Sequence, residues 1–200
     1  MRTPVFVRWA WMMLILAGIS CQRPALDGAA VENSAVAHGQ SVAPPTPLIL
    51  GVDEGERRVR RFAVSAPRFI LKVDPQNGGS RDLTMGYEDL PPGASIPPHW
   101  HKIADEILFV HRGSGVVELG KRQEKVAAGA TIYIPKDVRI TLRNTGTEPL
   151  SIAFFFSKPG FEEFLREMSA VEGESFVPLS ESELRDLRKR HESHTVYEKP

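Results

Sequence analysis

Short apolar stretches separated by turn-forming residues run through the middle of the chain. They lie at residues 69–73, 83–87, 96–101, 106–112, 116–119, 131–134, 138–142 and 150–157, with a further short one near Val126. Such stretches, at intervals of roughly eight to twelve residues, are typical of an all-β protein whose antiparallel strands form a sandwich or barrel. The pair Asn77-Gly78, between the first two stretches, favours a β-hairpin there. The pattern therefore predicts an antiparallel jelly-roll architecture.

The pattern changes after the last of these stretches. An apolar stripe at i, i+3, i+4 and i+7 begins at Phe161 and predicts a helix that packs on the sandwich. Ser180 and Glu183 have the spacing of a capping box, which predicts a second helix that ends near Arg190. The polar end, residues 191–200, is expected to be loosely held. The fold class is thus all-β with one or two C-terminal helices.

The N-terminal end has the pattern of a targeting segment. Two arginines precede the apolar run 9–17, which is too short to span a bilayer as a permanent helix. The run leads to Gly-Ile-Ser-Cys, which resembles the lipobox of bacterial lipoproteins and predicts lipidation of Cys21. We therefore expect a lipoprotein-type signal peptide at residues 1–20. The alternatives are an uncleaved membrane anchor or an ordinary secretory signal with an incidental cysteine.

Composition suggests how the rest of the chain is divided. Residues 21–47 are rich in Ala, Gly, Ser and Pro, which favours a flexible tether. We expect the barrel at residues 48–157 and a C-terminal helical extension at 158–200. With a lipidated cysteine ahead of the tether, the protein is expected in the cell envelope. It would be lipid-anchored on the periplasmic or outer side of a bacterial membrane.

Length and charge limit the classes of function. The chain has 200 residues, of which 42% are hydrophobic, and this suits one domain with peripheral segments. Lys and Arg together number 25, as do Asp and Glu, so no general basic field attracts nucleic acid. Cys21 is the single cysteine, so no intrachain disulfide can form.

A histidine pair gives the chain its candidate chemistry. His99 and His101 lie one residue apart in a predicted strand, so their side chains share one face while Trp100 faces away, outward or into a subunit contact such as a homodimer. Glu106 opens the next predicted strand and would lie beside both imidazoles. Two imidazoles and one carboxylate resemble the facial triad that binds Fe(II) and related divalent metals with open positions. The alternative is a polar cluster whose members satisfy one another without metal.

The same stretch resembles a known family. The first cupin motif, G-x5-H-x-H-x4-E-x6-G, is met at all five fixed positions between Gly93 and Gly113. The chain is similar to small single-domain bacterial cupins. This resemblance implies a double-stranded β-helix, which is the jelly-roll barrel of cupins. It also implies a divalent transition metal (Fe, Mn, Ni, Cu or Zn) on His99, His101 and Glu106.

The second cupin motif, G-x5-P-x-G-x2-H-x3-N, is met only in part. Gly129, Pro135 and Asn144 stand at its fixed positions. Asp137 replaces the glycine, and Ile140 replaces the histidine that serves the family as fourth metal ligand. We expect Ile140 to face the same interior as the other ligands, leaving three protein ligands for a metal.

Other polar residues near the predicted site are weaker candidates. Tyr87 and Tyr133 could transfer protons if they point inward. His111 falls on the opposite strand face from Glu106, and His191 with His194 lacks converging ligands.

These observations allow two functions. One is a metal-dependent cupin enzyme, a dioxygenase-like oxidoreductase on a small organic substrate. The other is a cupin lipoprotein with a degenerate metal site that binds a small ligand without chemistry.

Overall fold

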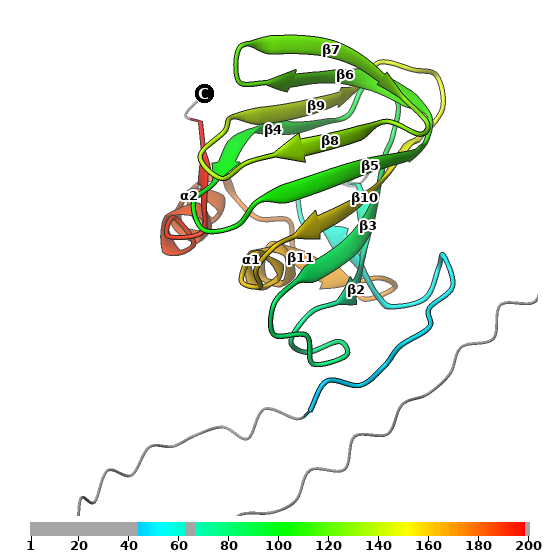
Figure 1. Ribbon diagram of the computed structural model, residues 1–200. Helices are drawn as coiled ribbons and strands as arrows, with labels where there is room; N and C mark the ends of the chain where they lie inside the picture. Colours follow the sequence, from blue (N-terminus) through cyan, green and yellow to red (C-terminus); the bar gives the residue numbers. More distant parts are fainter. Residues whose placement is uncertain (1–43, 63–66, 199–200) are drawn as a thin grey trace, which may run out of the picture. The chain divides into compact units, whose positions relative to one another are not determined.

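Antiparallel strands are the main secondary structure of the described part of the chain, which comprises residues 44–62 and 67–198 of a computed structural model (Figure 1). The strands are β1 (Glu56–Arg60), β2 (Arg68–Val73), β3 (Thr84–Leu90), β4 (Ser95–His101), β5 (Glu106–Arg112), β6 (Ser114–Leu119), β7 (Arg122–Ala127), β8 (Thr131–Ile134), β9 (Ile140–Asn144), β10 (Leu150–Phe156), β11 (Ser169–Val171) and β12 (Thr195–Tyr197). The helices are α1 (Phe161–Glu167) and α2 (Glu181–Arg190). In this part of the chain, neither helix has the length and apolar character needed to cross a membrane.

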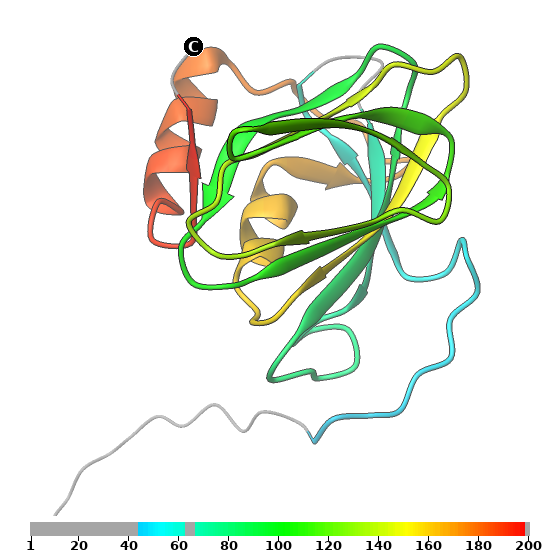
Figure 2. The same cartoon turned by 45° about the horizontal axis from the view of Figure 1, so that its top comes forward.

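The strands form two antiparallel sheets. One has the order β11-β1-β2-β3-β10-β5-β8, and the other has the order β12-β4-β9-β6-β7. Strands distant in the chain are neighbours in both sheets, for example β3 beside β10 and β4 beside β9. Figure 2 shows the sheets curving around a common interior. The predicted fold class, an antiparallel double-stranded β-helix with C-terminal helices, is confirmed.

Side chains that alternate along the strands fill this interior. In β10, Phe154 and Phe156 are buried, whereas Phe155 is 39% exposed on the outer face. Burial of a large apolar side chain stabilises a fold by about 1.5–3 kcal/mol, so such positions dominate the stability of the barrel. On the outer face, Phe155 lies beside Ile107, which pairs with Tyr133, and all three are partly exposed.

The C-terminal segment differs from the prediction. Both predicted helices are present, and α2 begins with the predicted capping box of Ser180 and Glu183. The expectation of a loosely held end is wrong, because β12 pairs with β4 and aligns Thr195 with His101 and Tyr197 with His99. A strand of three residues between polar neighbours has too little periodicity to be recognised in the sequence.

The predicted segment boundaries remain predictions. The predicted extension, residues 158–200, supplies β11 to the edge of one sheet and β12 to the edge of the other. The predicted signal peptide and Cys21 lie outside the described residues.

The departure from the second motif at Asp137 leaves the turn between β8 and β9 intact. Asp137 has a φ of 64°, the left-handed conformation that glycine adopts without strain and that aspartate tolerates better than most residues. Its backbone N–H donates to the carbonyl of His101 at 2.7 Å. The turn therefore holds the end of β4, where His99 and His101 lie.

Replacement of Asp137 tests this account. Asp137→Val should lower the free energy of unfolding by about 1–2 kcal/mol, because a β-branched residue is strained in the left-handed region. Asp137→Gly should not lower it, because glycine adopts this conformation freely. Urea unfolding of both variants measures the difference, and equal stability of the valine variant and the unchanged protein would contradict the argument.

Candidate metal centre

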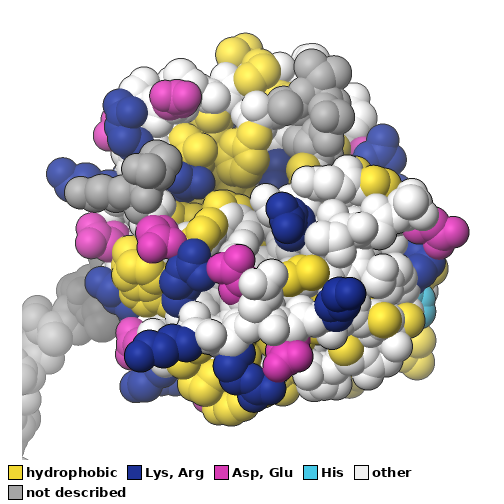
Figure 3. Space-filling model, turned by 90° about the horizontal axis from the view of Figure 1, so that it is seen from above, with side chains coloured by type: hydrophobic (Ala, Val, Ile, Leu, Met, Phe, Trp, Pro, Cys, Tyr) yellow, Lys and Arg dark blue, Asp and Glu magenta, His cyan; other side chains and the backbone are white. Residues whose placement is uncertain are grey.

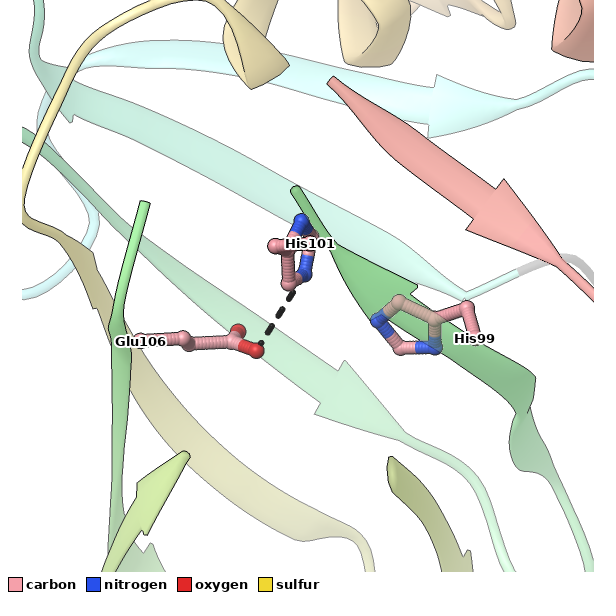
Figure 4. Close-up of side chains that lie close together, drawn as sticks. All are labelled: His99, His101 and Glu106. Atoms are coloured by element: carbon pink, nitrogen blue, oxygen red, sulfur yellow. Dashed lines mark ion pairs between the residues drawn. The ribbon is translucent and has the colours of Figure 1, made fainter. Parts of the chain in front are cut away.

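The three predicted ligands come together inside the barrel. His99 and His101 project from one face of β4, and Glu106 projects toward them from the first position of β5 (Figure 4). One ligand atom from each lies within 4.8 Å of those from the other two. The residues are 4%, 3% and 6% exposed, respectively. The alternation of side chains in β4 and the tight connection to β5 produce this cluster, as expected from the sequence.

Hydrogen bonds fix the orientation of both imidazoles. His99 Nδ1 lies 2.8 Å from the carbonyl oxygen of Pro97. A carbonyl only accepts, so His99 Nδ1 carries the proton and its Nε2 lone pair is free. His101 Nδ1 is hydrogen-bonded to Thr195 Oγ1, also at 2.8 Å. In both rings the Nδ1 atom is engaged, which leaves Nε2 as the atom available to a metal.

The facing ligand atoms do not satisfy one another. His101 Nε2 and Glu106 Oε2 are 3.4 Å apart, which is longer than a charge-assisted hydrogen bond of about 2.7–2.9 Å. Both atoms are buried and lack a hydrogen-bond partner among the described residues. Unpartnered buried acceptors are costly, and a bound cation would satisfy them. The donor set therefore fits a divalent metal better than it fits a self-contained polar cluster.

His99 has the protonation state that a metal ligand needs. Burial lowers the pKa of His99 to about 3, and the neighbouring His101, Arg60 and Arg188 act in the same direction. The ring is therefore neutral at ordinary pH, so a metal need not displace a proton from it.

Ile140 occupies the position predicted for it. It pairs with His99 across β4 and β9, is buried, and lines the same cavity as His99 and Glu106. An aliphatic side chain thus stands where a fourth protein ligand would otherwise project. The chain offers three protein ligands, which is the number typical of catalytic metal sites with open positions.

A small cavity adjoins the cluster. It has a volume of about 50 Å³, which is room for a few water molecules. Its walls are mostly apolar and include Ile96, Leu108, Ile152, Phe154, Phe156, Phe161, Phe164, Leu165 and Met168. Figure 3 shows a hollow in one face of the molecule where hydrophobic side chains gather beside Lys and Arg side chains.

Four further polar residues line this cavity, and sequence reasoning did not single them out. Arg60 and Glu88 form a buried ion pair at 2.8 Å. Burial raises the pKa of Glu88, and Arg60 opposes this effect. Tyr197 stacks on His99 with ring centroids 5.4 Å apart, and the Arg188 guanidinium lies 4.4 Å from the Tyr197 ring centroid. Burial also raises the pKa of Tyr197.

The two tyrosines considered as possible proton-transfer groups do not line this cavity. Tyr87 lines a groove on the outer face, where its ring contacts His111 edge-on at 5.7 Å between centroids. Tyr133 is 54% exposed and donates to Asp105. Both side chains point outward because each has the outward parity of its strand, so the condition for proton transfer is not met. His111 faces outward, as predicted from its spacing to Glu106.

The C-terminal histidines do not converge on a metal. His191 Nε2 is 2.9 Å from Glu167 Oε1, whereas His194 Nδ1 is hydrogen-bonded to Ser193. Within residues 44–62 and 67–198, the cluster of His99, His101 and Glu106 is the only one with metal-ligand geometry.

Comparison with known proteins agrees with this fold. Residues 86–156, which contain the three ligands, match the family described as "Cupin domain". The structure is similar to that of a predicted oxalate decarboxylase from Thermotoga maritima, with a TM-score of 0.50 and 17% identity over 56% of this chain and 100% of the other. At that identity the likeness shows the fold alone. The family match and the fold support a cupin.

The curated relatives of this chain have different descriptions. The tetracenomycin polyketide synthase protein TcmJ of Streptomyces glaucescens is 25% identical over 52% of this chain and 77% of its own length. Protein SchB of Streptomyces halstedii is 32% identical, with 41% of this chain and 59% of its own length covered. The dimethylsulfoniopropionate lyase DddW of Ruegeria pomeroyi is 32% identical, with 48% and 61% covered. The chain thus spans only about three fifths of the last two relatives.

The hydrogen bond between His101 Nδ1 and Thr195 Oγ1 can be tested in metal-free protein. Thr195→Val keeps the shape of the side chain but leaves the buried His101 Nδ1 without a partner, which should lower the free energy of unfolding by about 1–3 kcal/mol. Thr131→Val, at an exposed position of β8, is the matched control and should change it by at most about 0.5 kcal/mol. Denaturant unfolding measures both, and equal effects would contradict a role for this bond.

Proposed function

We propose that this protein is a metal-binding cupin that holds one divalent transition metal on His99, His101 and Glu106. The observation that carries this proposal is the pair of buried, unpartnered atoms His101 Nε2 and Glu106 Oε2 beside a neutral His99. Two imidazoles and one carboxylate suit Fe, Mn, Ni, Cu or Zn. When bound, the metal would supply Lewis acidity and coordination positions that the protein leaves open.

The residues around the cluster favour an enzyme, specifically a dioxygenase-like oxidoreductase on a small organic substrate. The apolar walls exclude bulk water, which strengthens electrostatic interactions inside the cavity. Glu88 and Tyr197 line the same cavity; Glu88 can hold or release a proton there, whereas Tyr197 keeps its proton and can donate a hydrogen bond. Burial raises the pKa of Glu88 toward neutral pH, and a general acid or base is most effective when its pKa lies near the working pH.

A second function, capture of a small ligand without chemistry, is favoured by buried Ile140, which pairs with His99 and offers no lone pair to a metal. At about 50 Å³ the cavity is much smaller than the roughly 300–1,000 Å³ of typical ligand pockets, so either function is limited to a very small ligand. The two functions use the same cavity, but only the enzyme requires the metal, and they differ in whether bound ligand is converted. Product formation from a bound ligand by the metal-loaded protein would decide for the enzyme.

The relatives support a small organic substrate and nothing narrower. One is described as a lyase for dimethylsulfoniopropionate and another as a polyketide synthase protein. One fold carries such different activities because chemistry depends on the side chains of the site.

Metal uptake tests the proposal. Metal-free protein should bind one equivalent of a divalent transition metal, and the fluorescence of Trp100, which lies between the two histidines, should change on titration. His101→Ala or Glu106→Ala should abolish stoichiometric uptake while the β-rich circular dichroism is kept. His111→Ala, on the outer face of β5, is the matched control and should bind as the unchanged protein does.

A negative result would also be informative. Protein that ignores Fe, Mn, Ni, Cu and Zn at micromolar concentrations, or a His111→Ala variant that fails equally, would overturn the proposed metal site. The small-ligand-binding function would then be the better account.

We also propose that the protein is a lipoprotein of the bacterial cell envelope, tethered through a lipidated Cys21. The support is the sequence alone: an arginine-bearing start, a short apolar run and Gly-Ile-Ser-Cys ahead of a segment rich in Ala, Gly, Ser and Pro.

Mass spectrometry of the mature protein checks the lipid anchor. The expected chain begins at Cys21 and carries acyl groups, and Cys21→Ser should abolish the modification. A mature chain with a different first residue, or with an unmodified Cys21, would return the localisation to plain secretion or to an uncleaved anchor.

A further inference from the structure

The cavity beside the metal ligands contains two arginines whose hydrogen-bonding capacity is only partly used. Arg60 comes from the end of β1, and Arg188 comes from α2. The Nε atom of each guanidinium is buried and lacks a hydrogen-bond partner among the described residues. Buried donors without partners are rare, so their occurrence together in one cavity indicates a missing acceptor.

Contacts hold both guanidiniums in place without using these Nε atoms. The Arg60 guanidinium is paired with Glu88 through its NH2 group and lies 5.7 Å from the Phe69 ring centroid. The Arg188 guanidinium lies over the ring of Tyr197. Arginine recognises carboxylates through N–H groups in a rigid fork, and a fork already fixed by neighbours loses less freedom on binding.

The charges of the cavity point to an anionic ligand once a metal is present. Besides the neutral His99 and Tyr197, its ionisable lining comprises two cations, Arg60 and Arg188, and two carboxylates, Glu88 and Glu106, which cancel when all are charged. A divalent metal on the triad adds two positive charges that no described side chain of the lining offsets. Uncompensated charge in an apolar cavity is costly, and a bound anion removes much of that cost. This step rests on the proposed metal site.

The remaining walls define the rest of the ligand. Phe154, Phe156 and Leu165 line the cavity, and its small volume admits only a few non-hydrogen atoms. We propose that the substrate is a small aliphatic carboxylic acid whose carboxylate binds to Arg60 and Arg188. Its apolar part lies against the phenylalanine and leucine side chains beside the metal.

Calorimetric titration of the Zn²⁺-loaded full chain tests this assignment with propionate as the probe. Propionate should bind, whereas propionamide, which has nearly the same shape but no charge, should bind far more weakly. Arg188→Met should weaken propionate binding about 30-fold or more, the effect expected when one member of a buried charge pair is truncated. Arg185→Met, at an exposed position one helical turn earlier in α2, is the matched control and should leave binding unchanged.

Arg60 needs a different variant because its removal alone would leave Glu88 buried without a partner. In Arg60→Met/Glu88→Met both charges are lost together, which often preserves folding. This double variant should also bind propionate weakly while Zn²⁺ uptake is retained. Far-ultraviolet circular dichroism confirms that it is folded, and the Arg188→Met result stands on its own if it is not.

The outcomes separate this inference from the metal site. If Zn²⁺ binds but propionate and propionamide bind alike, or Arg188→Met binds propionate as the unchanged protein does, the carboxylate site is wrong and the metal site stands. If Zn²⁺ itself is not taken up, the proposed function fails, and the charge argument for an anionic substrate fails with it.

Discussion

Strand β4 must turn two imidazoles into an apolar interior while both of its edges are hydrogen-bonded to neighbouring strands. The pairing with β9 places Ile140 beside His99, and the pairing with β12 places Thr195 beside His101. Pro97, in β4 itself, accepts from His99, and Thr195 engages His101. Because buried polar atoms require partners, these bonds satisfy the Nδ1 atoms and leave His101 Nε2, which faces Glu106, without a partner. The apolar side chains and the two arginines of the cavity lie around this pair of atoms, His101 Nε2 and Glu106 Oε2.

The sequence predicts what depends on local geometry. Parity along a strand is enough to place His99 with His101, and a five-residue step into the next apolar stretch places Glu106 beside them. The sequence does not reveal that Tyr197 lines the cavity, because Tyr197 reaches it through pairing of β12 with β4, two strands far apart in the chain. Arg60 escaped notice for the same reason, because its partner Glu88 is 28 residues away. Long-range pairing of short strands leaves no periodic signal to read.

The tyrosines also show that residue type alone does not identify the groups that face the cavity. Tyr87 and Tyr133 have the residue type that proton transfer needs, but strand parity turns both outward. Tyr197 has that type and also faces the cavity, although it belongs to a segment whose polar composition suggested a loose end. Residue type therefore indicates which side chains are able to transfer a proton, and the direction of each side chain decides whether it can do so inside the cavity.

The two departures from the second cupin motif have different consequences because one affects the backbone and the other affects a side chain. Asp137 keeps the left-handed turn that glycine would adopt, so the turn that anchors β4 is retained. Ile140 keeps the inward direction of the position but offers no lone pair, so the donor set falls to three. A metal held by three protein ligands has more positions for exogenous ligands than one held by four. At the proposed metal site, the loss of the fourth ligand would leave a larger share of the coordination to a substrate, in a cavity where two arginines already offer unpartnered donors.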